Sequence, residues 1–291
     1  MPLDQPWEDD HDYYDNEDRD PKSGKEMSFI EHIEELRWHL IRALGAIAVF
    51  TIASFFLLDF VYNNIILGPS KPDFWTYRMM CKLGNALGVS GLCIDKFDFI
   101  LINTEVSGQF AMAMMSGLIM GLMFAFPYAF YEIWRFVKPG LKESERSAAR
   151  FAVFWVSLLF FMGVLFGYYI VSPLAINFLA NFQLDPTIKN QFTIDSYISI
   201  LATMTLACGI TFQLPVAVYV LSILGIMTTS FMRTYRRHAL VVILIVAAII
   251  TPSPDITSQF LVALPLTLLY EVSILVSARV NKRREKELEN A

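Results

Sequence analysis

The chain has 291 residues, of which 55% are hydrophobic and only 18% are charged, and its mean hydropathy is +0.47. Soluble domains average about a quarter charged residues, so this composition excludes an ordinary soluble domain and indicates an integral membrane protein. The formal net charge of −5 comes from an acidic N-terminal segment. The rest of the chain is close to neutral, and nothing in it suggests nucleic-acid binding.

The first 28 residues form a strongly acidic segment, with ten Asp or Glu residues against three Lys or Arg. Such a segment cannot bury a core, so we predict a disordered tail over 1–28. It lacks the basic start and apolar centre of a cleaved secretory signal. We therefore expect the chain to insert through its own first span.

Six uncharged runs follow, at about 43–58, 106–131, 151–184, 196–232, 239–254 and 256–270. A span needs roughly 20 apolar residues, and its backbone polar groups must be satisfied within it. We therefore predict an all-α, polytopic bundle of six transmembrane helices over 29–279, followed by a charged tail over 280–291. The third run is expected to break near Ser172-Pro173 and the fourth to end near Leu224-Gly225.

The fifth run is short, because it has only 12 residues, from Ala239 to Ile250, before the proline-rich stretch 251–255 ends the helix. These residues cover only about 18 Å. The sixth run restarts at once and contains Pro265 and Glu271. The resulting short hairpin could thin the bilayer around it or pack inside the bundle without meeting lipid.

The cationic residues orient the chain. With the N-terminus in the cytoplasm, 18 of the 23 Lys and Arg residues fall in cytoplasmic segments, so both termini are predicted to be cytoplasmic. Cys81 and Cys93 then lie in the first external loop, where a disulfide between them is one hypothesis and two free thiols the other.

The residue pattern holds no catalytic constellation, nucleotide loop or metal motif, so we expect neither an enzyme nor a cofactor. His32, His39 and His238 lie at the cytoplasmic boundary and are interpreted as interfacial residues. Gln213 is the notable polar residue deep in a span. It could bond the carbonyl group freed by Pro215 or contact a partner helix.

Two carboxylates at the cytoplasmic boundary stand out. Glu35 precedes the first span and Glu145 follows the second, so both face one compartment. They could serve only helix-end electrostatics. Alternatively, a fixed pair of carboxylates would suit a ligand that carries arginine, because carboxylates and guanidinium groups form bidentate pairs.

Five motifs resemble the TatC family, the signal-peptide receptor subunit of the twin-arginine protein translocase. They are His32-Ile33-x-Glu35-Leu36-Arg37, Tyr131-Glu132-Ile133-Trp134-x-Phe136-x-x-Pro139-Gly140-Leu141, Glu145-Arg146, Phe212-Gln213-Leu214-Pro215-Val216 and Thr251-Pro252-x-Pro254-Asp255-x-x-Ser258-Gln259. The resemblance covers about residues 28–279.

This resemblance implies a multi-pass protein of the cell inner membrane that binds the twin-arginine signal peptides of folded precursors at its cytoplasmic face. It implies TatA- and TatB-type single-span partners, a homo-oligomeric receptor complex and transport driven by the proton-motive force. The signal-binding residues would be Glu35, Arg37, Phe136, Pro139, Glu145 and Arg146. Polar positions for partner contacts would be Gln213, Pro215, Asp255, Gln259 and Glu271.

Two features depart from the family pattern. Many members carry Glu where this chain has Gln213, and the first external loop contains an apparent insertion around 70–98. Rival interpretations are a small-solute channel or carrier, which the uncharged span centres disfavour, and a structural membrane scaffold, which leaves the boundary carboxylates without a purpose.

Overall fold

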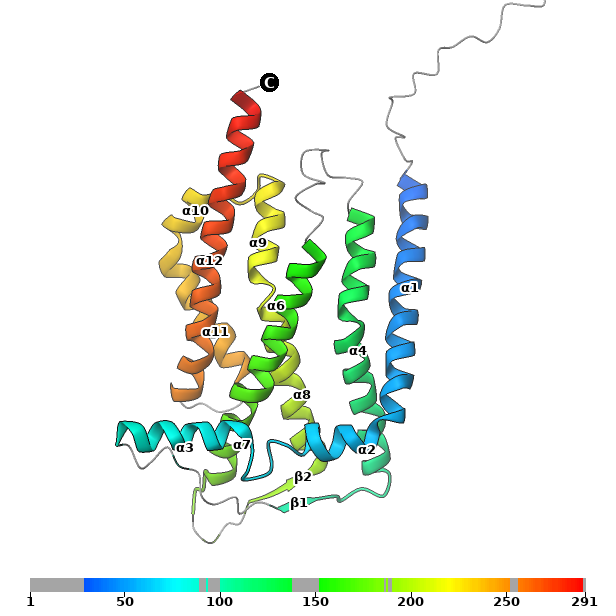
Figure 1. The fold of residues 1–291 in the computed structure, drawn as a ribbon, viewed down its shortest axis with the longest axis vertical. Helices are drawn as coiled ribbons and strands as arrows, with labels where there is room; N and C mark the ends of the chain where they lie inside the picture. Colours follow the sequence, from blue (N-terminus) through cyan, green and yellow to red (C-terminus); the bar gives the residue numbers. More distant parts are fainter. Residues whose placement is uncertain are drawn as a thin grey trace, which may run out of the picture.

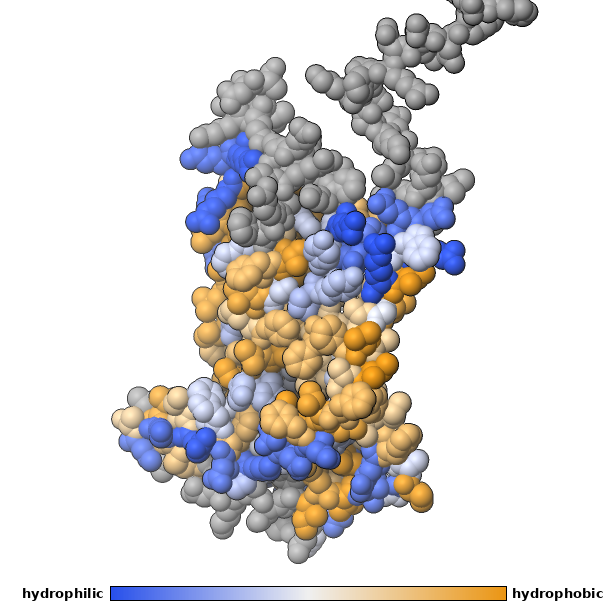
Figure 2. Space-filling view, turned by 45° about the vertical axis from the view of Figure 1, so that its right-hand side comes forward, coloured by the Kyte–Doolittle hydropathy of each residue, from blue (hydrophilic) through white to orange (hydrophobic). Residues whose placement is uncertain are grey.

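The structure, a computed structural model, describes residues 29–88, 93, 100–137, 152–185, 187, 190–251 and 256–289. The predicted disordered tail, residues 1–28, lies outside these ranges. Within them, five helical segments are long and apolar enough to cross a membrane. These are Glu34–Phe56, Gly108–Val137, Ala152–Asn181, Ile194–Ile223 and Ser258–Arg283. Figure 2 shows their apolar surface as an orange belt between more hydrophilic ends.

The long helices run along one axis of the molecule (Figure 1). The path passes through α1 (Phe29–Phe56), α4 (Gly108–Val137), α6 (Ala152–Phe166) with α7 (Ser172–Asn181), α8 (Ile194–Thr211) with α9 (Leu214–Ile223), α11 (Arg236–Ile250) and α12 (Ile256–Glu289). Helix α1 begins and α12 ends at the same end of the bundle, here called the terminal end. The short α10 (Thr229–Thr234) precedes α11.

The opposite end, here called the sheet end, carries small elements. After α1 come α2 (Leu58–Phe60), the π-helix η1 (Val61–Ile66) and α3 (Trp75–Leu87). Strand β1 (Ile100–Ile102) pairs in parallel with β2 (Gln191–Thr193), with Leu101 opposite Phe192. This small sheet was not predicted, because three-residue strands are too short to show a hydropathy alternation.

The predicted break at Ser172-Pro173 was wrong. The chain stays helical through the π-helix η5 (Gly167–Val171), so α6, η5 and α7 form one continuous rod. Pro173 comes two residues after the end of this π-helix, and the buried Ser172 hydroxyl donates to the Gly167 carbonyl over 2.8 Å. Proline lacks the backbone N–H that would continue the helical hydrogen bonds, and a local π-helical turn with a side-chain donor can satisfy the freed carbonyl group without ending the helix. The fourth span, in contrast, ends as predicted, with Gly225 at a φ of +76°.

Helix α11 confirms a short fifth helix, because its 15 residues extend only about 22 Å. Ile243, Ala247 and Ile250 are buried in a cluster with α7, α8 and α12, whereas Val242 and Ile249 are exposed on the other side. One face of α11 therefore packs inside the bundle, as one of the two predicted alternatives has it, while the opposite face stays exposed.

Helix α12 is longer than the short sixth span that the sequence predicted. It has 34 residues and continues to Glu289, through most of the segment assigned to a charged tail. Pro265 costs the helix one backbone hydrogen bond, but the neighbouring Val262 and Leu266 are buried in the core. This packing holds the helix together on both sides of the proline.

Helix α1 packs along α4 at very close range. A Cβ atom added to Gly121 would lie only 2.7 Å from the backbone of Thr51, so only glycine permits this approach. Small residues at helix contacts are a common way to bring membrane helices together. The α1–α4 pair positions the boundary residues described next.

Candidate ligand site at the terminal end

The residues of this site come from the first half of α1 and the last three turns of α4. On α1, Glu35, His39 and Arg42 recur at spacings of four and three residues, so they share one face of the helix. On α4, Tyr128, Glu132 and Phe136 recur at four-residue intervals and likewise share one face of their helix. The close α1–α4 packing brings these two faces together.

The centre of the site is a buried contact between His39 and Glu132. The imidazole Nδ1 lies 2.6 Å from Glu132 Oε2, and the two residues are only 5% and 2% exposed. Tyr128 also hydrogen-bonds to Glu132, and Arg42 Nη1 lies 3.9 Å from its Oε2. The Glu132 carboxylate therefore has two hydrogen-bonding partners and a nearby guanidinium group, as a buried carboxylate requires.

Glu35 occupies the open side of this cluster. Its Oε1 lies 3.9 Å from His39 Nε2, and its side chain keeps 37% of its accessible surface. Phe136 covers the same imidazole, with the two ring centroids 6.3 Å apart. The Glu35 carboxylate can therefore still accept hydrogen bonds from a ligand, whereas the buried Glu132 carboxylate already has its partners within the protein.

The structure separates some residues that the sequence grouped together. Arg37 is exposed and lies two residues from Glu35, hence about 200° around the helix. The remaining predicted positions lie outside the described residues, namely Pro139, Glu145, Arg146 and Asp255.

Sequence reasoning missed Glu132 and misread His39. The prediction of an interfacial His39 was wrong, because the close α1–α4 contact buries it against Glu132. One signal was available, since an acidic residue inside the helical apolar stretch of a span needs a polar partner. Which residue pairs with it depends on helix packing.

Three of the five polar positions predicted for partner contacts make bonds within the chain. Gln213 Nε2 donates to the Val156 carbonyl of α6 over 3.1 Å, rather than to its own helix. Its Oε1 is buried without a hydrogen-bond partner in the described part of the chain. Pro215 is buried at the start of α9. Gln259 Nε2 donates to the Leu244 carbonyl, and Glu271 pairs with Arg236 at 2.7 Å.

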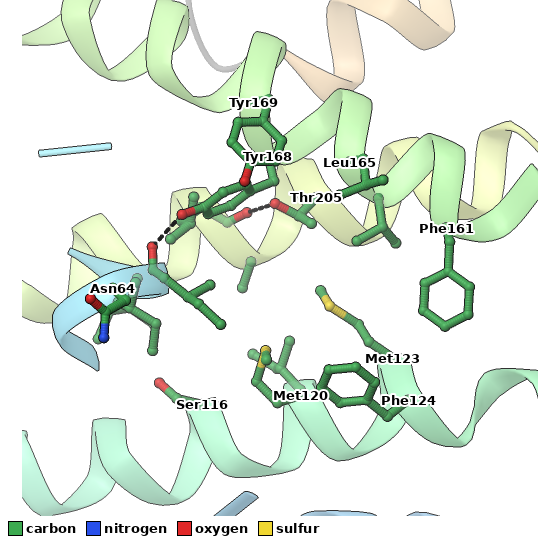
Figure 3. A pocket seen from close by; sticks show the side chains of 17 residues that line it. Asn64, Ser116, Met120, Met123, Phe124, Phe161, Leu165, Tyr168, Tyr169 and Thr205 are labelled. Atoms are coloured by element: carbon green, nitrogen blue, oxygen red, sulfur yellow. Dashed lines mark hydrogen bonds between the residues drawn. The ribbon is translucent and has the colours of Figure 1, made fainter. Parts of the chain in front are cut away.

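An open cavity of about 440 Å³ lies between η1, α4, α6 and α8, toward the sheet end. Figure 3 shows Met120, Met123, Phe124 and Phe161 on its walls. Ser116, Thr205 and the tyrosine hydroxyls add a few polar atoms, and the Tyr168 hydroxyl is engaged by the Ile65 carbonyl at 2.7 Å. This lining suits an apolar chain rather than a cation.

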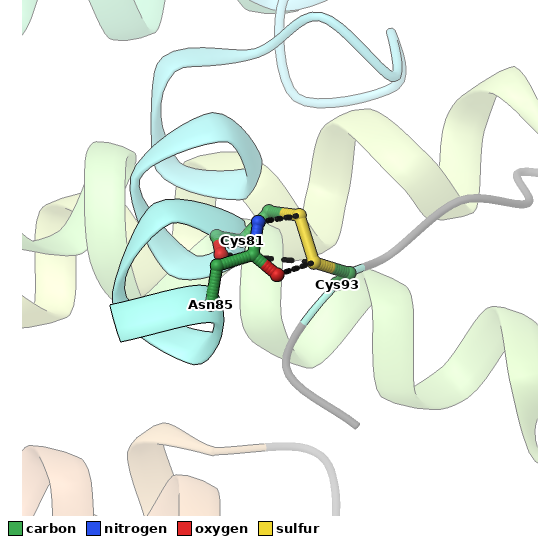
Figure 4. Close-up of a disulfide and its surroundings, with 3 residues drawn as sticks. All are labelled: Cys81, Asn85 and Cys93. Carbon is green, nitrogen blue, oxygen red and sulfur yellow. Dashed lines mark hydrogen bonds between the residues drawn. A yellow bond between two sulfur atoms is a disulfide. The ribbon is translucent and has the colours of Figure 1, made fainter. Parts of the chain in front are cut away.

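Cys81 of α3 and Cys93 are joined by a disulfide (Figure 4). Among the described residues, no group of three or more His, Cys, Asp or Glu side chains is placed to hold a metal ion.

Comparison with known proteins gives a consistent answer. The family model "Sec-independent protein translocase protein (TatC)" matches residues 31–265. The TatC of Blattabacterium from Periplaneta americana is 39% identical over 261 residues, covering 89% of this chain and 98% of that protein. TatCy of Bacillus subtilis is 33% identical, covering 90% and 92%. A crystal structure described as the twin arginine translocase receptor TatC aligns with a TM-score of 0.64 at 29% identity, covering 85% and 99%.

Proposed function

The chain belongs to the TatC family of Sec-independent protein translocase proteins, and we propose that it binds the twin-arginine signal peptides of folded precursors at the terminal end of the bundle. Membership makes it a multi-pass membrane component of a protein translocase. The proposal adds the ligand, the site and the orientation.

The observation that carries the proposal is the Glu35 carboxylate, held beside a buried His39–Glu132 pair yet open to a ligand. A guanidinium group offers two parallel N–H donors to such a carboxylate, which lysine cannot do. Glu145 would supply a second carboxylate, with Arg37, Phe136, Pro139 and Arg146 completing the surface. A solved relative is itself described as a translocase receptor.

We extend the proposal to partners and energy source. TatA- and TatB-type single-span proteins would dock along the apolar helices, with Gln213, Pro215, Asp255, Gln259 and Glu271 as the polar positions expected for such contacts. Several copies of the chain would form the receptor complex in the cell inner membrane. The terminal end would face the cytoplasm, and transport would use the proton-motive force.

The test is capture of a folded precursor by the purified, bilayer-embedded chain. A precursor with an Arg-Arg signal should co-purify with the chain, and the same precursor with Lys-Lys should be strongly depleted. Equal capture of both forms would reject recognition of arginine, since an ammonium group carries the same charge but lacks the planar pair of donors.

A further inference from the structure

Helix α3 lies inside the apparent insertion at 70–98, to which the family resemblance assigns no role. Figure 1 shows α3 lying across the sheet end, at a steep angle to the long helices. Because the long helices cross the membrane, a helix perpendicular to them at their ends lies parallel to the membrane surface.

The inner face of α3 is firmly attached to the bundle. Tyr77 is 2% exposed, and its hydroxyl lies within hydrogen-bond distance of two carbonyl oxygens, those of Pro69 at 2.8 Å and Pro173 at 3.2 Å. The neighbouring Thr76 hydroxyl donates to the Tyr169 carbonyl. Phe74 stacks on the Tyr169 ring with centroids 5.6 Å apart. These contacts fix the rotation of α3 about its own axis.

This rotation leaves an apolar stripe exposed. Trp75, Met79 and Leu83 follow one another at four-residue intervals, so they line one side of the helix, and they are 49%, 40% and 52% exposed. In Figure 2 the arm at the lower left carries orange and pale atoms above blue ones, so its apolar side is turned toward the orange belt.

The charged side of α3 is purely cationic. Arg78 and Lys82 are exposed, and the 13 residues Trp75–Leu87 include no Asp or Glu. The Cys81–Cys93 disulfide leaves the helix away from the stripe, because Cys81 is two residues, or about 200°, from both Met79 and Leu83. The bridge therefore attaches Cys93 to α3 on a side of the helix away from the stripe.

We propose that α3 is an interfacial helix that binds the bilayer surface at the sheet end. Trp75, Met79 and Leu83 would enter the boundary of the acyl chains, and Arg78 and Lys82 would contact anionic phospholipid headgroups. An apolar side with Trp and Leu beside a cationic side is the pattern of helices that lie in the membrane interface. The lipid chemistry therefore matches both exposed sides of α3, which a purely apolar protein partner would not.

Site-directed spin labelling of the full chain tests this proposal. Met79→Cys and Leu83→Cys would be labelled separately in a Cys208→Ala background, with Lys82→Cys as the control on the charged side of the same helix. In vesicles of phosphatidylethanolamine and phosphatidylglycerol, the two stripe labels should collide mainly with oxygen, which concentrates in lipid. The control label should collide mainly with a water-soluble nickel chelate.

Equal and high nickel accessibility at all three positions would overturn the proposal, because the stripe would then face water rather than lipid. Mass spectrometry should first show an intact Cys81–Cys93 bridge in each variant. A second measurement avoids new cysteines altogether. In a chain whose other four tryptophans are replaced by phenylalanine, brominated lipids should quench the fluorescence of Trp75, and an absence of quenching would also contradict lipid contact.

Discussion

His39 lies between two carboxylates, and its two ring nitrogens face different acids. Nδ1 is 2.6 Å from Glu132, whereas Nε2 is 3.9 Å from Glu35. The first contact is buried and links α1 to α4, and the second reaches the surface. One imidazole thus connects the helix contact to the proposed ligand site.

At this scale, Glu132→Ala should destabilise the protein by about 1–3 kcal/mol, because it leaves the His39 imidazole and the Tyr128 hydroxyl without their buried acceptor. Thermal unfolding in detergent measures the effect. The control is Glu271→Ala, which removes an ion pair whose side chains are both nearly half exposed and should cost less than about 1 kcal/mol. Equal losses in the two variants would show that burial of the His39–Glu132 contact contributes no extra stability.

Glu35→Gln should weaken binding of a twin-arginine signal peptide by about 1.5–3 kcal/mol, the value of a hydrogen bond to a charged group, which raises Kd roughly 10- to 150-fold. Glu145→Gln should act similarly. Glu34 is adjacent and exposed, so Glu34→Gln is the matched control and should leave Kd nearly unchanged. Titration of a fluorescent peptide measures Kd, and wild-type affinity in both Glu35→Gln and Glu145→Gln would disprove the assigned site.

At the scale of elements, α1 and α4 form the scaffold of the site, and Gly121 sets their separation. Gly121→Val should force the helices apart, because the new Cβ would clash with the Thr51 backbone. We expect a destabilisation of about 1–3 kcal/mol, typical of overpacking, together with weaker signal-peptide binding.

The control for this variant is Gly45→Val on α1, since no atom lies within 4 Å of a Cβ placed there. Unfolding temperature and peptide affinity should both stay close to wild type in the control. If Gly121→Val behaves like Gly45→Val in both measurements, the close approach of the two helices is not needed for the site.

Proline positions in the sequence do not by themselves predict where the helices of this protein end. Pro173 and Pro265 look alike in sequence, yet neither ends its helix. A π-helix precedes Pro173, and buried neighbours stabilise the helix around Pro265. Gly225, in contrast, follows the end of the fourth span as predicted, because glycine adopts the positive φ found there without a steric penalty.

At the scale of the whole molecule, α1 begins and α12 ends at the same end of the bundle (Figure 1). With the cationic residues concentrated on one predicted side, we expect this end to face the cytoplasm. A green fluorescent protein fused after Ala291 should therefore fluoresce, and alkaline phosphatase fused there should be inactive.

The matched control places alkaline phosphatase near the exposed Leu184, between α7 and β2, where the enzyme should be active. Active phosphatase at the C-terminus, or inactive phosphatase near Leu184, would invert the proposed topology. The same result would move α3 and its lipid contact to the opposite membrane surface.

The amino-acid sequence by itself determined the membrane class, the positions of the apolar runs, the short α11 and the family, since each follows from local composition or from motifs in fixed order. It also identified Glu35 as a ligand-binding candidate. Only the tertiary structure decided that His39 and Glu132 meet across 93 positions and that α3 leaves its apolar stripe exposed. The physical reason is that hydropathy determines which segments enter lipid, whereas the choice of contacting faces depends on close packing between helices.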